Sequence, residues 1–243
     1  TTNIPPFVSH VTENLQKAGF EAYLVGGCVR DMLMGKQPKD WDLTTNARPE
    51  EIQQTFQSLK TVYENTYGTV TIVNMPANED DRDVTRETPL EEVQVTTYRS
   101  EGGYADNRHP EHVSYETNIE KDLERRDFTM NAIAWDPIKD TYIDPYGGIK
   151  DIKDKLVRCV LYPEKRFSED ALRIMRAVRF STALSFAIES ETLAALTAQA
   201  GSITSISTER VRDEFLKIIV SDHPAFGISL LERTGLLVHI IPE

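Results

Sequence analysis

The segment between residues 22 and 45 constrains the fold of this chain more tightly than any other. It contains a short apolar strand at 22–25, the pair Gly26-Gly27, a helical pattern around 29–34 and a second strand pattern at 41–45. Adjacent glycines after a buried strand let the backbone approach a ligand closely, and their amides lie near the start of a helix. The segment therefore predicts a unit built on a sheet, with a place for a triphosphate at the glycine turn.

Two aspartates, Asp40 and Asp42, accompany the second strand of this segment. Residues two apart on a strand point to the same face, so we expect both carboxylates on one side and Trp41 on the other. Paired carboxylate oxygens suit one or two Mg²⁺ ions, completed by water and substrate phosphate. Arg30, one turn inside the helix, could reach the same anion. Diglycine turns and Asp-x-Asp pairs are each common alone, but their combination predicts metal-dependent chemistry on a triphosphate.

The hydrophobic periodicity changes from mixed to wholly helical along the chain. Besides the segment above, we predict helices at 6–18, 49–56, 119–126, 163–184, 190–199, 207–220 and 224–235, and strands at 70–73, at 93–98 and within 132–142. This order predicts an α+β fold with two domains, a catalytic domain at 1–148 and an all-helical domain at 149–243. The apolar residues at 236–241 predict that more helical protein follows, so we expect the chain to be truncated at its C-terminus.

The net charge of −12 and the pI of about 5.0 are unusual for a protein that binds nucleic acid. Phosphate contacts would have to come from a small part of the surface, and Lys and Arg cluster at 125–126 and 165–179. No apolar run is long enough to span a membrane. Cys28 and Cys159 are far apart and form no Cys-x-x-Cys pair, which indicates a reducing compartment and predicts a cytoplasmic protein without a zinc site. Nothing in the sequence implies an obligate protein partner.

Five segments, taken in order, resemble the conserved motifs of one known family. The sequence GGCVRDMLMG at 26–35, followed by Asp40 and Asp42, resembles motif A of the class II nucleotidyltransferases, which include the CCA-adding enzymes of bacteria and eukaryotes and the bacterial poly(A) polymerases. The other four resemblances are RRDFTMNAIA at 125–134 to motif B, IDPYGG at 143–148 and the segment up to 160 to motif C, EDALR at 169–173 to motif D, and ERVRDE at 209–214 to motif E.

This resemblance covers nearly the whole chain, and it implies both a fold and a set of site residues. The implied fold is a polymerase-β-like head with a small mixed or antiparallel sheet, followed by a helical neck and the start of a body. The implied catalytic metal ligands are Asp40 and Asp42. The implied nucleotide-binding residues are Gly26, Gly27, Arg30, Arg125, Arg126, Asp127, Asn131, Glu169, Asp170 and Arg173. The implied helix-stabilising residues are Glu209, Arg210 and Glu214.

The spacing of the EDALR segment agrees with a role in reading a base. At about 100° per residue, one stripe of the predicted 163–184 helix carries polar residues and the opposite face carries apolar ones. The polar stripe consists of Arg166, Glu169, Asp170 and Arg173, and the apolar face of Phe167, Ala171, Ile174, Met175 and Val178. Asp170 could accept from the exocyclic amine of CTP or ATP while Arg173 donates to the ring, a pattern that uracil and guanine do not match. An ordinary salt bridge between Glu169 and Arg173 on a solvated helix is the alternative.

Two further positions bear on which nucleotides are added. Residues Arg99, Tyr104, Asp106 and Arg108 fall in the segment that corresponds to the family's flexible loop, which lets the site change from C to A and is shortened in enzymes that add only CC. This chain keeps the segment, although it has Arg-His-Pro at 108–110 where the family more often has Arg-Arg-Pro. It has Gln94 where relatives commonly carry an acidic residue, so any role of Gln94 in metal binding is left open.

The function we predict is the Mg²⁺-dependent addition of C and A nucleotides from CTP and ATP to the 3′ end of tRNA, with release of pyrophosphate. Asn131, a polar residue in an apolar run, would contact ribose or phosphate. A poly(A) polymerase, or a tRNA nucleotidyltransferase that adds only A, is the first alternative, because motifs A and B do not distinguish these enzymes. A catalytically silent RNA-binding module that keeps the fold is the second.

Overall fold

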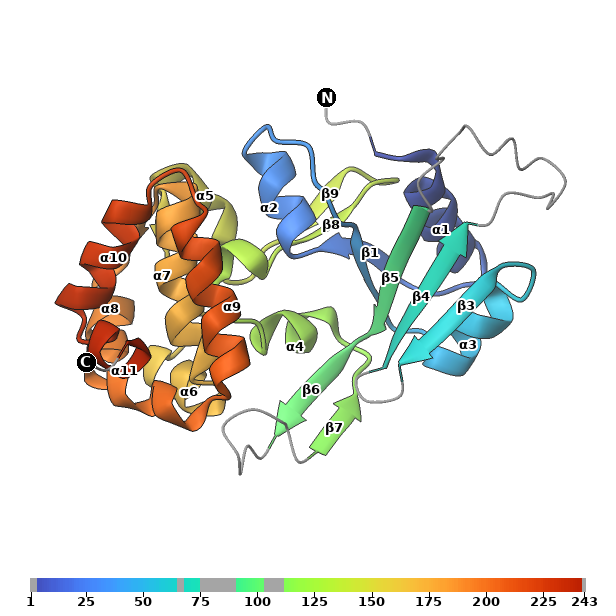
Figure 1. Cartoon of the computed structure of the whole chain (residues 1–243). Coiled ribbons are helices and arrows are strands. Elements are labelled where there is room, and N and C mark those ends of the chain that lie inside the picture. Colours follow the sequence, from blue (N-terminus) through green and yellow to red (C-terminus); the bar gives the residue numbers. More distant parts are fainter. Residues whose placement is uncertain (1–3, 65–67, 75–90, 103–111, 242–243) are drawn as a thin grey trace, which may run out of the picture. The chain divides into compact units, whose positions relative to one another are not determined.

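The computed structural model describes residues 4–64, 68–74, 91–102 and 112–241 (Figure 1). The chain forms two compact units whose segments alternate along the sequence. The first unit comprises Thr1–Ser100, Ser114–Leu123 and Ile133–Ile143, and the second comprises Glu101–Val113, Glu124–Ala132 and Asp144–Glu243. No helix in the described ranges is both long enough and apolar enough to cross a membrane. The single domain boundary at residue 148 stays a prediction.

The first unit is built on a seven-stranded sheet with the order β3-β4-β5-β2-β1-β8-β9. Its strands are β1 (Ala22–Val25), β2 (Asp42–Thr45), β3 (Lys60–Glu64), β4 (Thr69–Asn74), β5 (Glu91–Thr97), β8 (Ala134–Asp136) and β9 (Thr141–Ile143). Strands β2 and β5 pair in parallel, and the other neighbours pair antiparallel. The predicted α+β fold with a mixed sheet is confirmed.

Two helices cover one face of this sheet. Both α1 (Pro6–Lys17) and α3 (Pro49–Thr55) contact β5 and one another, and Figure 1 shows them behind the strands. Each helix has proline in its first turn, where the missing N–H costs no helical hydrogen bond. Alternate residues of the strands point to the face that these helices cover. Those residues, among them Leu43 and Val95, are apolar and buried. The opposite face carries the polar residues of the same strands, including Asp42.

The first unit also contains α2 (Gly27–Leu33) between β1 and β2, and α4 (Ile119–Glu124), whose last residue belongs to the second unit. A separate two-stranded ribbon pairs β6 (Arg99–Gly102) with β7 (His112–Tyr115). The ribbon begins directly after β5, because only Tyr98 separates the two strands.

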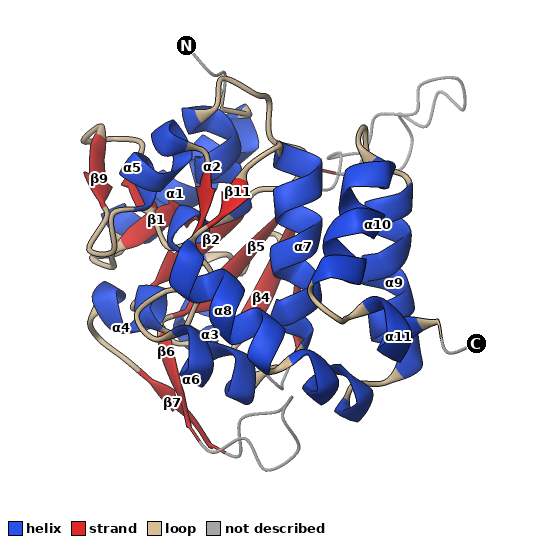
Figure 2. Ribbon diagram, turned by 90° about the vertical axis from the view of Figure 1, so that its left-hand side faces the viewer, coloured by secondary structure: helices blue, strands red, loops and turns tan. Residues whose placement is uncertain are grey.

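The second unit is almost entirely helical. Its elements are η2 (Thr129–Asn131), α5 (Gly148–Asp154), β10 (Leu156–Val157), α6 (Pro163–Glu169), α7 (Leu172–Leu184), β11 (Ala187–Ile188), α8 (Ser190–Ala198), η3 (Ala200–Ser205), α9 (Thr208–Ile219), α10 (Pro224–Arg233) and α11 (Leu237–Ile240). Helices α7, α9 and α10 pack against one another, as Figure 2 shows. Gly227 makes the approach of α10 possible, because a Cβ at this position would overlap Ile218 and Thr182. The predicted change to an all-helical region is confirmed.

One local prediction is wrong. The predicted helix 163–184 is two helices, α6 and α7, because Asp170 adopts an extended backbone (φ −144°, ψ 103°) and its side chain accepts a hydrogen bond from the backbone N–H of Leu172. The strand predicted within 132–142 is confirmed as β8; it pairs antiparallel with β9, and Trp135 of β8 stacks on Tyr142 of β9. Strand β3 was not predicted at all, since no clear alternation marks it.

Candidate functional site

The glycine pair forms the predicted turn from β1 into α2. Gly26 has φ 78° and ψ −132°, a backbone conformation that side chains with a Cβ do not tolerate, and it precedes the first residue of the helix. An added Cβ at Gly27 would lie 3.7 Å from the guanidinium of Arg30, so the arginine lies over the turn. Arg30 itself donates to Asp31 with N–O distances of 2.9 and 2.7 Å. The turn and the arginine are thus brought together as predicted.

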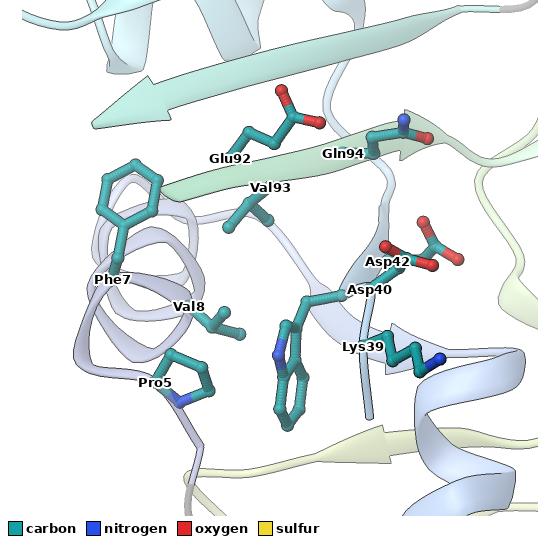
Figure 3. Close-up of a pocket in the computed structure, with 10 residues that line it drawn as sticks. Pro5, Phe7, Val8, Lys39, Asp40, Asp42, Glu92, Val93 and Gln94 are labelled. Carbon is teal, nitrogen blue, oxygen red and sulfur yellow. The ribbon is translucent and has the colours of Figure 1, made fainter. Parts of the chain in front are cut away.

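Asp40 and Asp42 lie together, but not for the reason that strand alternation gave. Strand β2 begins at Asp42, so Asp40 occupies the bend before it and is exposed, whereas Asp42 is half-buried. Both nevertheless line the same two cavities. One, of about 320 Å³, also contains Gly27 and Arg30. The other, of about 610 Å³, is shown in Figure 3 with both aspartates at one end.

Lys36 and Lys39 were not predicted as site residues, although they line the cavity that contains the glycine turn, Arg30 and the two aspartates. Lys39 lines the second cavity as well, and Figure 3 shows it beside the aspartates. Both lysines are exposed. The sequence offered one signal for them. Both lie in the short connection between α2 and β2, where any side chain stays close to Asp40. The cavity therefore combines carboxylates with several cationic groups.

Gln94 lies directly beside Asp42. The two residues are Cα partners in the parallel pairing of β2 with β5, so their side chains project from the same face of the sheet. Glu92, two residues earlier on β5, lines the same large cavity, and Figure 3 shows both side chains on β5. In the described part of the chain, no three His, Cys, Asp or Glu side chains gather closely enough to hold a metal ion. A metal held by Asp40 and Asp42 would need further ligands from water or substrate.

Asp127 is the centre of a buried cluster in the second unit. Its carboxylate accepts from Arg176 at 2.8 Å and from the side-chain amide of Asn131 at 3.1 Å. Burial alone would raise the pKa of Asp127, but the charge of Arg176 and the hydrogen bonds from Asn131 and Arg176 outweigh it and lower the pKa to about 2. The polar character of Asn131 inside an apolar run is thus explained by Asp127. The hydrogen bond between Asn131 and Asp127 fixes the turn that follows Arg125 and Arg126. Both arginines are half-buried.

Glu169, Asp170 and Arg173 lie close together at the junction of α6 and α7. Glu169 accepts from Arg166 at 2.7 Å and from Arg173 at 2.8 Å, so the salt bridge of the alternative interpretation is present. Arg173 also donates to the backbone carbonyls of Arg166 at 3.1 Å and Arg125 at 3.0 Å. These bonds use three of the five N–H groups of Arg173. The three bonds hold the guanidinium rigidly. Its other two N–H groups have no partner within the described ranges.

The predicted helix-stabilising residues are on α9. Arg210 donates to the second oxygen of Asp170 at 3.0 Å, so it holds this carboxylate from the side opposite to Leu172. Glu214 is buried and forms ion pairs with Arg179 and with Lys217. Burial would raise the pKa of Glu214, but the charge of Arg179 outweighs it and lowers the pKa. Glu209 is exposed in the first turn of α9, where its charge favours the helix.

The arginines of segment 165–179 do not form the open basic surface that their number suggested. Arg166, Arg173, Arg176 and Arg179 each form an ion pair with a carboxylate of the second unit. Arg166 meets Glu169 within α6, whereas each of the other three meets an aspartate or glutamate outside its own helix, α7. Of the predicted loop residues, Arg99 begins β6, while Tyr104, Asp106 and Arg108 lie outside the described residues.

Comparison with known proteins places these features in a family. Residues 22–158 match the model of the poly A polymerase head domain, and residues 185–243 match the model described as the probable RNA and SrmB-binding site of polymerase A. The chain is 42% identical over 223 residues to the CCA-adding enzyme of Lactobacillus helveticus, which covers 90% of this chain and 52% of the relative.

Two solved structures are similar to nearly the whole chain. The Bacillus stearothermophilus CCA-adding enzyme in complex with CTP has a TM-score of 0.82 and 38% identity over 96% of this chain and 53% of its own. The Thermotoga maritima CCA-adding enzyme complexed with tRNA has a TM-score of 0.78 and 25% identity over 99% of this chain and 54% of its own. The chain thus spans about half the length of the relatives that it matches.

Proposed function

Because the chain belongs to the family of the poly A polymerase head domain, we propose that it adds C and A nucleotides from CTP and ATP to the 3′ end of tRNA. The observation that carries this proposal is the cavity in which Asp40 and Asp42 lie beside Gly27, Arg30 and the two lysines. Carboxylates suit a divalent cation, and the cationic groups suit a triphosphate. The CTP and tRNA complexes of similar CCA-adding enzymes support the choice of substrates.

The two aspartates fit Mg²⁺ as the proposed metal. Their oxygens are the hard donors that this ion prefers, and the cavity that they line leaves open space for water and phosphate oxygens. Mg²⁺ bound there would supply charge stabilisation at the phosphates and at the attacking and leaving oxygens. Asp40 and Asp42 would hold it, and Gln94 would face it with an uncharged amide.

The chain's own residues would position the triphosphate. The backbone at Gly26-Gly27 allows phosphate oxygens to approach, and Arg30, Lys36 and Lys39 would neutralise their charge. In the proposed reaction the 3′-hydroxyl of the RNA attacks the α-phosphate, a new phosphodiester bond forms, and pyrophosphate leaves with the charge of its oxygens balanced by these cationic groups.

The base would be read by side chains of the second unit. Asp170 would accept from the exocyclic amine that cytosine and adenine share, and the remaining N–H groups of Arg173 would donate to the ring. Glu169 and Arg210 would hold these two groups in place, since each forms an ion pair with one of them. A preformed polar site of this kind rejects a base with the wrong pattern, because a buried donor or acceptor would be left unsatisfied.

The location we propose for this protein is the cytoplasm. Both cysteines are buried free thiols, and burial raises the pKa of Cys28 to about 11 and of Cys159 to about 12. Neither is therefore prepared to form a disulfide, which suits a reducing compartment.

Incubation of the full chain with tRNA that lacks its 3′ CCA, labelled CTP and ATP, and Mg²⁺ tests the proposal. We expect extension by C, C and A, read by sequencing of the product, and its loss in Asp40→Ala. Glu13→Ala, which removes an exposed carboxylate of α1 in the same unit, should extend tRNA like the wild type.

The products separate the alternatives. Extension by A alone, or by a long run of A, would replace CCA addition with one of the other activities of the family. Binding of tRNA without any extension, at RNA concentrations well above the dissociation constant, would favour a silent RNA-binding module. Binding of CTP measured by calorimetry, and weakened in Asp40→Ala, would independently support a nucleotide site in the first unit.

A further inference from the structure

Asp122 is a buried carboxylate of the first unit that lies outside the predicted site. It belongs to the short helix α4, and its side chain has 0% exposure. A carboxylate so deeply buried costs several kcal/mol unless hydrogen bonds or charges compensate for the loss of water. Its contacts therefore indicate what it contributes to the structure.

The carboxylate of Asp122 accepts from two elements that are far apart in sequence. The hydroxyl of Thr44, on β2, lies 3.2 Å from Oδ2. The backbone N–H of Arg99, the first residue of β6, lies 3.4 Å from Oδ1. Thr44 is fully buried too, and its hydroxyl lies 3.2 Å from the backbone carbonyl of Thr96 on β5. Asp122 thus joins α4 to strand β2 and to the start of the ribbon.

Thr44 connects this junction to the aspartates. It follows Asp42 by two residues on β2, so both side chains project from the same face of the sheet. A hydrogen bond that fixes Thr44 therefore restrains the rotation of the strand that carries Asp42. Because strand β2 has only four residues, a restraint at its third residue acts on the whole element.

We propose that Asp122 is a positioning residue that holds β2, through Thr44, in the orientation that presents Asp42 to a divalent cation. This inference rests on the proposed metal site at Asp40 and Asp42. Asp122 does not touch the metal, the nucleotide or the reacting atoms. Its effect is expected to appear as metal affinity, because groups that orient the ligands of a metal commonly change its affinity by about 10-fold or more.

Alanine is an informative replacement at this position, because it removes both oxygens that accept from Thr44 and Arg99. Asparagine would keep the link, since its amide N–H can donate to the Thr44 hydroxyl while that hydroxyl donates to the carbonyl of Thr96. Thr44→Val removes the hydroxyl from the other side of the contact with Asp122, together with its contact to Thr96, at nearly the same volume.

The experiment measures Mn²⁺ binding to the full chain by electron paramagnetic resonance, in the presence of CTP. We expect Asp122→Ala to weaken Mn²⁺ binding about 10-fold and Thr44→Val about threefold. The double variant should lose less affinity than the product of the two single losses, because both changes remove the contact between Asp122 and Thr44. The matched control is Thr45→Val. Thr45 is the next buried threonine of β2, and its hydroxyl donates instead to the carbonyl of Glu21.

The control is expected to change stability without changing Mn²⁺ affinity. If Asp122→Ala does not fold, as judged by circular dichroism, Thr44→Val carries the test alone. Wild-type affinity in both Asp122→Ala and Thr44→Val, or an equal loss in Thr45→Val, would overturn the inference while the proposed function stands. Absence of Mn²⁺ binding by the wild type, or binding that Asp42→Ala does not alter, would instead overturn the proposed function and this inference with it.

Discussion

The candidate sites of the two units differ in how their charged residues are exposed and paired. In the first unit, Asp40 is exposed and Asp42 half-buried, and both line open cavities. In the second unit, Asp127 and Arg173 are buried, and each has its charge balanced by a partner from the same unit. Asp40 and Asp42 thus lie beside open space, whereas the charges of Asp127 and Arg173 are balanced within the second unit.

This difference indicates what each region is suited to bind. Carboxylates beside open space can take a cation from solution, and their affinity depends on how many charges they bring. A closed network of ion pairs holds its donors and acceptors in fixed directions, which suits the recognition of a polar pattern rather than the capture of an ion. The price of such a network is the desolvation of its members, which each partner must offset.

The largest expected effect is on base selection, where the network is proposed to act. Asp170→Ala or Arg173→Ala should reduce the preference for CTP and ATP over UTP about 100-fold, because the side chain that matches the base is lost. The measurement is kcat/KM for each nucleotide with tRNA as acceptor. Mn²⁺ binding should stay intact, since the proposed metal ligands Asp40 and Asp42 are in the other unit.

Arg212→Ala is the control for base selection, because this exposed arginine of α9 pairs only with its neighbour Asp213 among the described residues. It should leave the preference unchanged. Undiminished discrimination against UTP in both Asp170→Ala and Arg173→Ala would refute the assignment of these residues to the base.

A smaller effect is expected on the free energy of unfolding. A buried carboxylate of the second unit should contribute to it, whereas an exposed carboxylate of the first unit should not. The pKa of Asp127 falls from its ordinary 3.8 to about 2 on folding, so the ionised carboxylate stabilises the second unit by about 2 kcal/mol. This contribution is complete above about pH 3.8 and is lost as the pH falls towards 2. Asp127→Asn should lower the free energy of unfolding, measured in urea, by about this amount at neutral pH.

The difference between Asp127→Asn and the wild type should narrow as the solution is acidified through the same interval. Asp40→Asn is the matched control from the first unit, because this exposed carboxylate should change the unfolding free energy little. Equal destabilisation by the two variants at neutral pH would remove the contrast between the units.

The smallest expected effect is on the Mg²⁺ concentration that activity requires, which depends on the number of carboxylates beside the proposed metal. Gln94→Glu places a carboxylate on the strand beside Asp42 and should lower the Mg²⁺ concentration for half-maximal activity about threefold. Thr71→Glu is the control, because Thr71 is the partner of Gln94 one strand further from Asp42. An equal change in both variants would show that overall charge, rather than the position beside Asp42, is responsible.

Much of the fold followed from local patterns. The glycine turn, the helices of the first unit and the helical second unit were predicted from glycine and proline positions and from apolar spacing, because these act within a few residues. The break at Asp170 was missed, since an aspartate that caps a helix with its own side chain looks in sequence like any polar residue on a helix. Strand β3 was missed because its residues alternate weakly and its pairing with β4 determines its conformation.

The site was predicted in part. The resemblance to family motifs supplied the candidate residues, and the structure gathers Gly27, Arg30, Asp40 and Asp42 around one cavity. Lys36 and Lys39 had no motif to mark them. The partners of the buried charges were also out of reach, since Asp127 meets Arg176 across 49 residues and Asp170 meets Arg210 across 40.

The sequence by itself determined which residues turn, which segments are helical and which two aspartates stand close together along the chain. Only the tertiary structure decided that Gln94 lies beside Asp42 and that Asp122 supports Thr44, because strand pairing and helix packing bring together residues separated by 52 and 78 positions. The physical reason is the range of the forces involved. Backbone preferences act over one or two turns, whereas the partner of a buried charge is fixed by the packing of the entire unit.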